Sequence, residues 1–273
     1  MKLAITHTTT FAYSQPLLYA MQTLHLWPQS GATQTVLDWG LQTPGVLDAL
    51  PDVLGNRLHS VCVTASADQR CLHLHIQARG VVDTHDLAQW QDDPKALHPA
   101  VFQRAGPLTQ PDDALTAWAR AQVATTEVSV VNALQLCHAV ADRVRYQAGV
   151  TEVQTTAAQA FAAGLGVCQD QAHVMAAAAR SLGWSARYVS GYFWAANEPD
   201  LASHAWVDVC LSPEHGHWLS LDVTHRCPTD ARHVRLAAGT DYVSCAPVRG
   251  VRRGGGEETL SVSVTIEPVL ASL

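Results

Sequence analysis

Residues 164–183, GLGVCQDQAHVMAAAARSLG, are the stretch that decides the fold. The stretch opens with a short glycine-containing segment that favours a flexible loop. From Cys168 onward it is rich in alanine and apolar on nearly all sides, until Gly183 ends the pattern. A helix that is apolar all round is usually buried. The sequence therefore predicts a buried helix over 168–182 that begins at or near Cys168.

Cys168 is a candidate nucleophile because of this position. The macrodipole and the unpaired N–H groups at a helix N-terminus favour an anion, and the thiolate is the reactive form of cysteine. The same N–H groups can stabilise an oxyanion. A structural thiol more often lies in the middle of an element, as Cys137 and Cys210 are predicted to lie.

A second stretch, SHAWVDVCLSPEHGHWLSLDVT at 203–224, supplies candidate partners for that thiol. Its period of two predicts two strands joined by a loop at 212–216, which together form a hairpin. Pairing back from the loop brings Asp222 roughly opposite His204. A carboxylate beside an imidazole fixes the ring tautomer and stabilises the imidazolium, as a catalytic triad requires. The alternative is that both are ordinary residues on a solvated strand face.

The spacing of apolar residues changes near residue 105, from the alternation typical of strands to the spacing typical of helices. This change predicts two domains, 1–105 and 106–273. Short alternating segments separated by turn signals make the first part β-rich and predict an antiparallel sheet or sandwich. The second part has helical spacing from about residue 110 and returns to strands after 185, so we expect an α+β protein. Strands are predicted at 6–13, 35–39, 58–63, 72–76, 186–193, 205–211, 218–224 and 260–266, helices at 133–146, 154–163 and 168–182, and a mobile loop at 254–256.

Composition excludes several classes of protein. Of the 273 residues, 48% are hydrophobic and 15% charged, which favours a globular core over disorder. The formal net charge of −7 argues against nucleic-acid binding, which needs a clustered basic surface. No apolar run is long enough for a membrane span, and the N-terminus lacks the apolar core of a secretion signal. We therefore expect a cytoplasmic protein without membrane contact.

Cysteine and histidine usage predicts no disulfide framework and no metal site. The seven cysteines are odd in number and form no C-x-x-C pair, which favours reduced thiols and argues against structural zinc. Cys62 and Cys71 are interpreted as half-buried strand thiols. The 14 histidines are scattered, so a metalloprotein is the weaker alternative. We expect no cofactor and no metal requirement.

The second half of the chain contains four recognisable blocks in order: GVCQD at 166–170, ARYVSGY at 186–192, SHAWVD at 203–208 and LDVT at 221–224. Together they resemble the bacterial transglutaminase-like cysteine-enzyme family. The resemblance extends to both ends of the chain, through the β-rich opening segment and Gly55-Asn56, and through GTDY at 239–242 and PVRG at 247–250. Val223 stands where the family usually has proline, and Thr240 where an arginine is common.

The resemblance implies a papain-like fold with a Cys–His–Asp triad. The nucleophile of the family matches Cys168, its base matches His204 and its orienting carboxylate matches Asp222. It implies acyl transfer on peptide or protein amides through a thioester on Cys168. Water as acceptor makes a peptidase or amidase, which we favour, and an amine makes a transglutaminase. A non-catalytic peptide-binding module is the alternative from another class.

Overall fold

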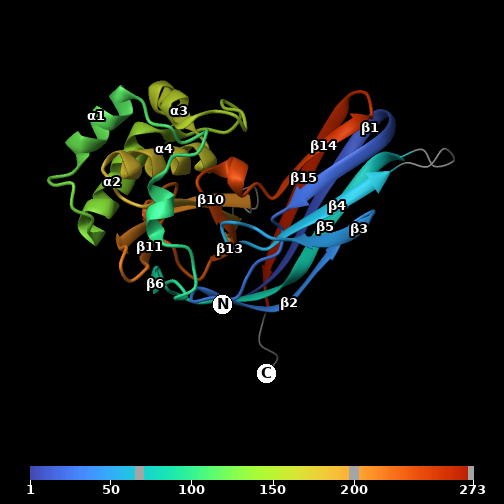
Figure 1. Cartoon of the computed structure of the whole chain (residues 1–273), viewed down its shortest axis with the longest axis horizontal. Helices are drawn as coiled ribbons and strands as arrows, with labels where there is room; N and C mark the ends of the chain where they lie inside the picture. Colours follow the sequence, from blue (N-terminus) through green and yellow to red (C-terminus); the bar gives the residue numbers. More distant parts are fainter. Residues whose placement is uncertain (65–70, 197–202, 270–273) are drawn as a thin grey trace.

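The computed structural model describes residues 1–64, 71–196 and 203–269, and it contains two large antiparallel sheets and four α-helices within those ranges. Figure 1 shows the first sheet on the right and the helices with the second sheet on the left. The predicted α+β class, with an N-terminal antiparallel sheet, is confirmed. In the described part of the chain, no helix is both long and apolar enough to cross a membrane.

The first sheet is organised around β1 (Lys2–Leu24), a single strand of 23 residues. The first half of β1 lies between β5 and β15, and its second half lies between β4 and β14. Alternate residues of β1, beginning at Leu3 and Ile5, are buried in one apolar core, as expected for a strand with one covered face. The other strands are β2 (Gln34–Gln42), β3 (Val46–Leu50), β4 (Leu58–Thr64), β5 (Cys71–Thr84), β14 (Val248–Gly254) and β15 (Glu258–Pro268).

The last two strands return to the first sheet, although the sequence had assigned them to the second domain. Leu24 pairs with Val248 in β14, and Leu3 pairs with Pro268 in β15. The predicted loop at 254–256 is the turn between these strands, and its three glycines have φ values of 77°, 88° and 63°, a region that favours glycine. The C-terminal segment therefore completes the N-terminal sheet. The predicted boundary at residue 105 itself stays a prediction.

The second sheet has the strand order β12-β11-β10-β9-β13. The two strands of the predicted hairpin are its neighbouring strands β10 and β11. β6 (Gln89–Gln91), from the part of the chain predicted as the first domain, pairs with β11 and adds a strand. β9 covers the predicted range 186–193. The bounds are β9 (Ala186–Phe193), β10 (Ser203–Ser212), β11 (His217–Asp222), β12 (Cys227–Pro228) and β13 (His233–Gly239).

The helices cover one face of the second sheet. α4 (Cys168–Ser181) is buried along almost its whole length and packs on β10 through Ala205, Val207 and Val209. These three residues share one strand face, as the period of two predicts. The other helices surround α4 and are α1 (Asp113–Gln122), α2 (Val130–Arg143) and α3 (Ala157–Ala163).

The opposite face of the second sheet packs against the first sheet. Tyr192, Val234 and Leu236 from β9 and β13 are buried in the same apolar core as β1. The hydroxyl of Tyr192 lies 2.9 Å from Nδ1 of His7 in β1, so a buried polar contact also joins the two sheets. The second sheet is thus held between the helices and the N-terminal sheet.

All seven cysteines are free. Cys137 is buried in α2 and Cys210 in β10, at the mid-element positions predicted for structural thiols. Cys71 is half-buried as expected, whereas Cys62 is exposed on β4.

Candidate active site

Cys168 is the first residue of α4, and a short strand pair fixes the loop that leads into it. β7 (Arg145–Tyr146) and β8 (Leu165–Gly166) pair in parallel, so the loop before the helix is ordered rather than free. Gly164, with φ of 70°, ends α3 and turns the chain into β8. The prediction that a helix begins at Cys168 is confirmed, and the thiol is half-buried.

Asp170 closes the first turn of α4. Its Oδ2 accepts hydrogen bonds from the backbone N–H of Val167 at 2.8 Å and from the hydroxyl of Thr151 at 2.7 Å. Asp170 lies in the first turn of α4, where the helix dipole favours a negative charge.

His204 and Asp222 form a buried ion pair at the edge of α4. Nε2 of His204 lies 2.8 Å from Oδ2 of Asp222, and both side chains have no exposed surface. The β10–β11 pairing ends at Val207 opposite Leu221, so Asp222 reaches His204 diagonally across the hairpin. The predicted proximity of the two residues is therefore observed.

The electrostatics of this pair favour the imidazolium form of His204. Burial alone would lower the pKa of His204, but its hydrogen bonds and charge interactions with Asp222 and Cys168 raise it to about 10. Burial alone would raise the pKa of Asp222, but hydrogen bonds from the histidines around it hold it well below its usual range. Because Asp222 occupies Nε2, Nδ1 is the ring nitrogen left to exchange a proton with Cys168.

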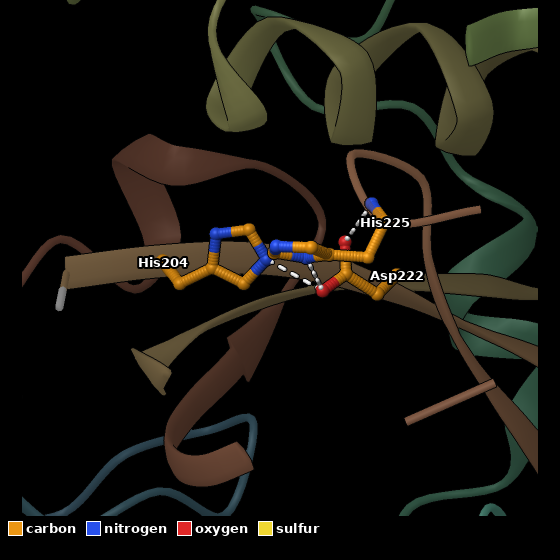
Figure 2. A group of neighbouring side chains, drawn as sticks. All are labelled: His204, Asp222 and His225. Atoms are coloured by element: carbon orange, nitrogen blue, oxygen red, sulfur yellow. Dashed lines mark hydrogen bonds and ion pairs between the residues drawn. The ribbon is translucent and has the colours of Figure 1, made fainter. Parts of the chain in front are cut away.

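Two further histidines converge on the same carboxylate oxygen. Nδ1 of His225 lies 2.6 Å and Nε2 of His233 lies 2.9 Å from Oδ2 of Asp222. Figure 2 shows the rings of His204 and His225 both directed at that oxygen, while the backbone N–H of His225 reaches Oδ1. Behind them, Nδ1 of His233 lies 3.1 Å from the backbone N–H of Asp230 and 3.3 Å from its Oδ1, so Asp230 holds this ring in place.

Gln171 ties the helix of Cys168 to the strand of Asp222. Its side-chain amide donates to the carbonyl of Val144 at 2.8 Å, and its side-chain carbonyl accepts from the hydroxyl of Thr224 at 2.7 Å. Gln171 lies one turn after Cys168, and Thr224 lies two residues after Asp222. This contact fixes the spacing between the two elements that carry the candidate nucleophile and the carboxylate.

The structure places His204 and Asp222 in direct contact, and Cys168 is among the groups that raise the pKa of His204. The catalytic roles of all three residues stay predictions. Sequence reasoning missed Gln171, His225 and His233. His225 lies only three residues after Asp222, which is a usable signal for a side chain that returns to the same group. His233 comes from β13, which pairs with β9, and nothing local in the sequence predicts its contact with Asp222.

Two protein families match this chain in sequence. Residues 116–223 match the transglutaminase-like superfamily, and residues 3–83 match the bacterial transglutaminase-like N-terminal region. The first match spans α1 to β11 and contains Cys168, His204 and Asp222. The second match contains β1 and most of β5. The resemblance stated from the sequence is confirmed.

Similar proteins cover nearly the whole chain. An uncharacterized protein from Mycobacterium leprae is 25% identical over 289 residues, covering 97% of this chain and 98% of that protein. A crystal structure titled "putative cysteine protease" from Cytophaga hutchinsonii has a TM-score of 0.76 and 21% sequence identity, covering 100% of this chain and 92% of that one. The fold, with its N-terminal sheet, is therefore that of a solved structure.

Proposed function

Because the chain couples a bacterial transglutaminase-like N-terminal region to a transglutaminase-like core, we propose that it is a cysteine-dependent acyl-transfer enzyme acting on amide or peptide bonds. The observation that carries this proposal is the buried His204–Asp222 pair, which leaves Nδ1 of His204 for the thiol at the start of α4. A non-catalytic peptide-binding module would have no need of a charged imidazole beside a thiol.

The first half of the reaction forms a thioester. The thiolate of Cys168 attacks the amide carbonyl carbon, and the carbonyl oxygen becomes an oxyanion. Backbone N–H groups in the first turn of α4 are in position to stabilise it, since the first N–H groups of a helix have no intrahelical partner. As the C–N bond breaks, the imidazolium of His204 gives its Nδ1 proton to the leaving amine.

The second half returns the enzyme to its starting state. His204, now neutral, takes a proton from a water molecule, and the oxygen attacks the thioester carbonyl. The C–S bond breaks, a carboxylic acid leaves, and the thiolate–imidazolium pair is restored. An amine in place of water would give a new amide by the same steps, which is the transglutaminase alternative. We favour water, because the resemblance implies a peptidase or amidase.

A peptide library incubated with the enzyme and read by mass spectrometry tests this proposal. We expect cleaved or deamidated products, and a spectrum that is unchanged when a primary amine is added. Products that carry the amine would assign the transglutaminase reaction instead. Cys168→Ala is the negative control, and Cys62→Ser, at an exposed thiol on β4, is the matched control that should keep activity. If neither peptide nor protein amides give any product, the result would favour the non-catalytic peptide-binding module.

A further inference from the structure

The side chains drawn in Figure 2 also make a set of metal ligands. Nε2 of His204, Nδ1 of His225 and Oδ2 of Asp222 all lie within 4.8 Å of one another. We propose that these three atoms bind a divalent cation of the zinc class, which removes the hydrogen bond that orients His204 and so blocks the enzyme. The site shares His204 and Asp222 with the proposed active site, so its effect on activity rests on the proposed function, whereas its binding of the cation is tested in a protein that lacks the thiol.

The donor set suits zinc in both chemistry and number. Two imidazoles and one carboxylate, with water in the fourth position, form a recurring zinc site. Metal binding releases protons from its ligands, so the cation would replace the protons that Nε2 of His204 and Nδ1 of His225 direct at Asp222. Zinc binds such donors at about 2.0–2.2 Å. The two nitrogens now lie 2.8 and 2.6 Å from the carboxylate oxygen. A tetrahedral cation with ligands at about 2.0–2.2 Å holds the donor atoms roughly 3.3–3.6 Å apart, so each nitrogen must move away from the oxygen by roughly 0.5–1 Å.

The hydrogen bonds around Asp222 are crowded on one oxygen. Oδ2 lies within 2.9 Å of ring nitrogens from three histidines, whereas the hydrogen bond to Oδ1 comes from the backbone N–H of His225 at 3.1 Å. A carboxylate oxygen offers about two lone-pair sites. A cation bound to two of these nitrogens would relieve the crowding, because their N–H protons would no longer compete for Oδ2.

His233 is the outer partner of this site and is not one of its ligands. Its Nε2 lies 2.9 Å from Oδ2 of Asp222, while its Nδ1 contacts Asp230. It is not among the three residues whose ligand atoms all lie within 4.8 Å of one another. A hydrogen bond to a ligating carboxylate is the usual role of such an outer residue, because it fixes the orientation of the ligand.

Access to the site is from the side of His225, and the thiol lies elsewhere. The side chain of His225 is 24% exposed, whereas those of His204 and Asp222 are fully buried. In the proposed reaction Cys168 exchanges a proton with Nδ1 of His204, while the cation would occupy the Nε2 edge of the ring. Cation binding at this site is therefore distinguishable from the ordinary reaction of a metal with the thiol.

Cobalt titration of Cys168→Ala protein tests the proposal. We expect one Co²⁺ per chain, with the visible absorption of nitrogen and oxygen ligands and without the near-ultraviolet band of a cobalt–thiolate bond. Zn²⁺ should displace it. Adding His225→Gln should weaken binding about tenfold or more. The matched control is His138→Gln, an exposed histidine whose ring contacts the carbonyl of Arg226 in the same loop, and it should bind as tightly as the parent.

Two results would overturn the site. One is equal cobalt affinity in the His225→Gln and His138→Gln proteins. The other is the absence of saturable binding in Cys168→Ala, which would assign all metal binding to the thiol. Circular dichroism checks the fold of each variant. A measurement that needs no histidine variant is NMR of the parent with Co²⁺, in which the ring protons of His204 and His225 must show the paramagnetic shifts.

Discussion

Nε2 of His204 lies 2.8 Å from Oδ2 of Asp222, with both side chains fully buried. A charged pair in such a site interacts more strongly than the same pair in water, because solvent does not screen it. The pair therefore holds His204 in its protonated form and in one orientation. The reactivity proposed for Cys168 depends on both properties.

Replacing the thiol should abolish turnover without changing the fold. We expect Cys168→Ala to lower kcat by roughly 10⁶-fold, the size of loss seen when a triad nucleophile is removed. The half-buried side chain at the start of α4 can shorten without opening a large cavity. The measurement is turnover of a library-selected peptide together with circular dichroism. Substantial activity in a folded Cys168→Ala protein would exclude the thioester mechanism.

The pH dependence of kcat/KM should report the ionisation of His204. Its pKa is raised to about 10, so the imidazolium needed for leaving-group protonation is present at neutral pH and is lost as pH rises through that value. Asp222→Asn removes one of the charges that raise this pKa. We expect the alkaline limb of the variant to move to lower pH by about one unit or more, with a lower kcat.

The same two proteins supply the outcome that would contradict this assignment. An alkaline limb at the same pH in wild type and Asp222→Asn would show that His204 is not the titrating group. Asp142→Asn is the control and should leave the profile unchanged, because that exposed carboxylate pairs with Arg226, whereas the groups that raise the pKa of His204 are Asp222 and Cys168.

Replacing the buried carboxylate of Asp208 should lower the stability of the fold. It is fully buried, Arg235 donates to its Oδ2 at 2.7 Å, Arg187 lies 3.2 Å away, and Ser220 donates to Oδ1 at 2.7 Å. Removing one partner of a buried pair leaves an uncompensated charge, so we expect Asp208→Asn to destabilise the protein by about 3–5 kcal/mol in urea unfolding. An effect as small as that of the exposed Asp142→Asn, about 1 kcal/mol or less, would contradict this.

Acid should remove this stabilisation of the wild-type protein. Burial alone would raise the pKa of Asp208, but Arg235 and Arg187 lower it below its ordinary 3.8. A carboxylate with a lowered folded-state pKa contributes stability that is present above the unfolded value and is lost as pH falls through the folded value. The difference between wild type and Asp208→Asn should therefore be constant above about pH 5 and shrink below pH 4.

Removing residues 248–273 should impair folding although every candidate site residue is retained. β1 would lose its pairing with β14 along one half and with β15 along the other. A long unpaired strand edge promotes aggregation. We expect low solubility and a lowered urea midpoint for any soluble fraction. Removal of 270–273 alone, which lie outside the described residues, is the control. A midpoint equal to that of the full chain after removal of 248–273 would contradict the prediction.

Local patterns in the sequence were sufficient to predict α4, β9 and the hairpin that carries His204 and Asp222. The all-apolar run after Cys168 and the period of two after Ser203 each report directly on burial, so they needed no tertiary information. Hairpin pairing then predicted the His204–Asp222 contact to within a diagonal step. The strand β13 was not predicted, so the contact of His233 with Asp222 was missed.

The pairing of the C-terminal strands β14 and β15 with β1 also could not be predicted from the sequence. The segment 248–254 contains three arginines and two glycines, which is unlike a buried strand. Charged residues are common on strands at the edge of a sheet, where one side stays in water. β14 is such an edge strand, almost wholly exposed, and its partner β1 lies more than 220 positions earlier in the chain.

The pairing of β1 with β15 has a consequence for synthesis on the ribosome. β1 is made long before β15, which completes one of its edges, and the interval from Leu24 to Glu258 takes on the order of 10–50 s at ordinary elongation rates. During that time the nascent chain can build the helices around α4 while one edge of β1 remains open. Nascent-chain chaperones therefore have time to bind that edge before β15 emerges and closes the sheet.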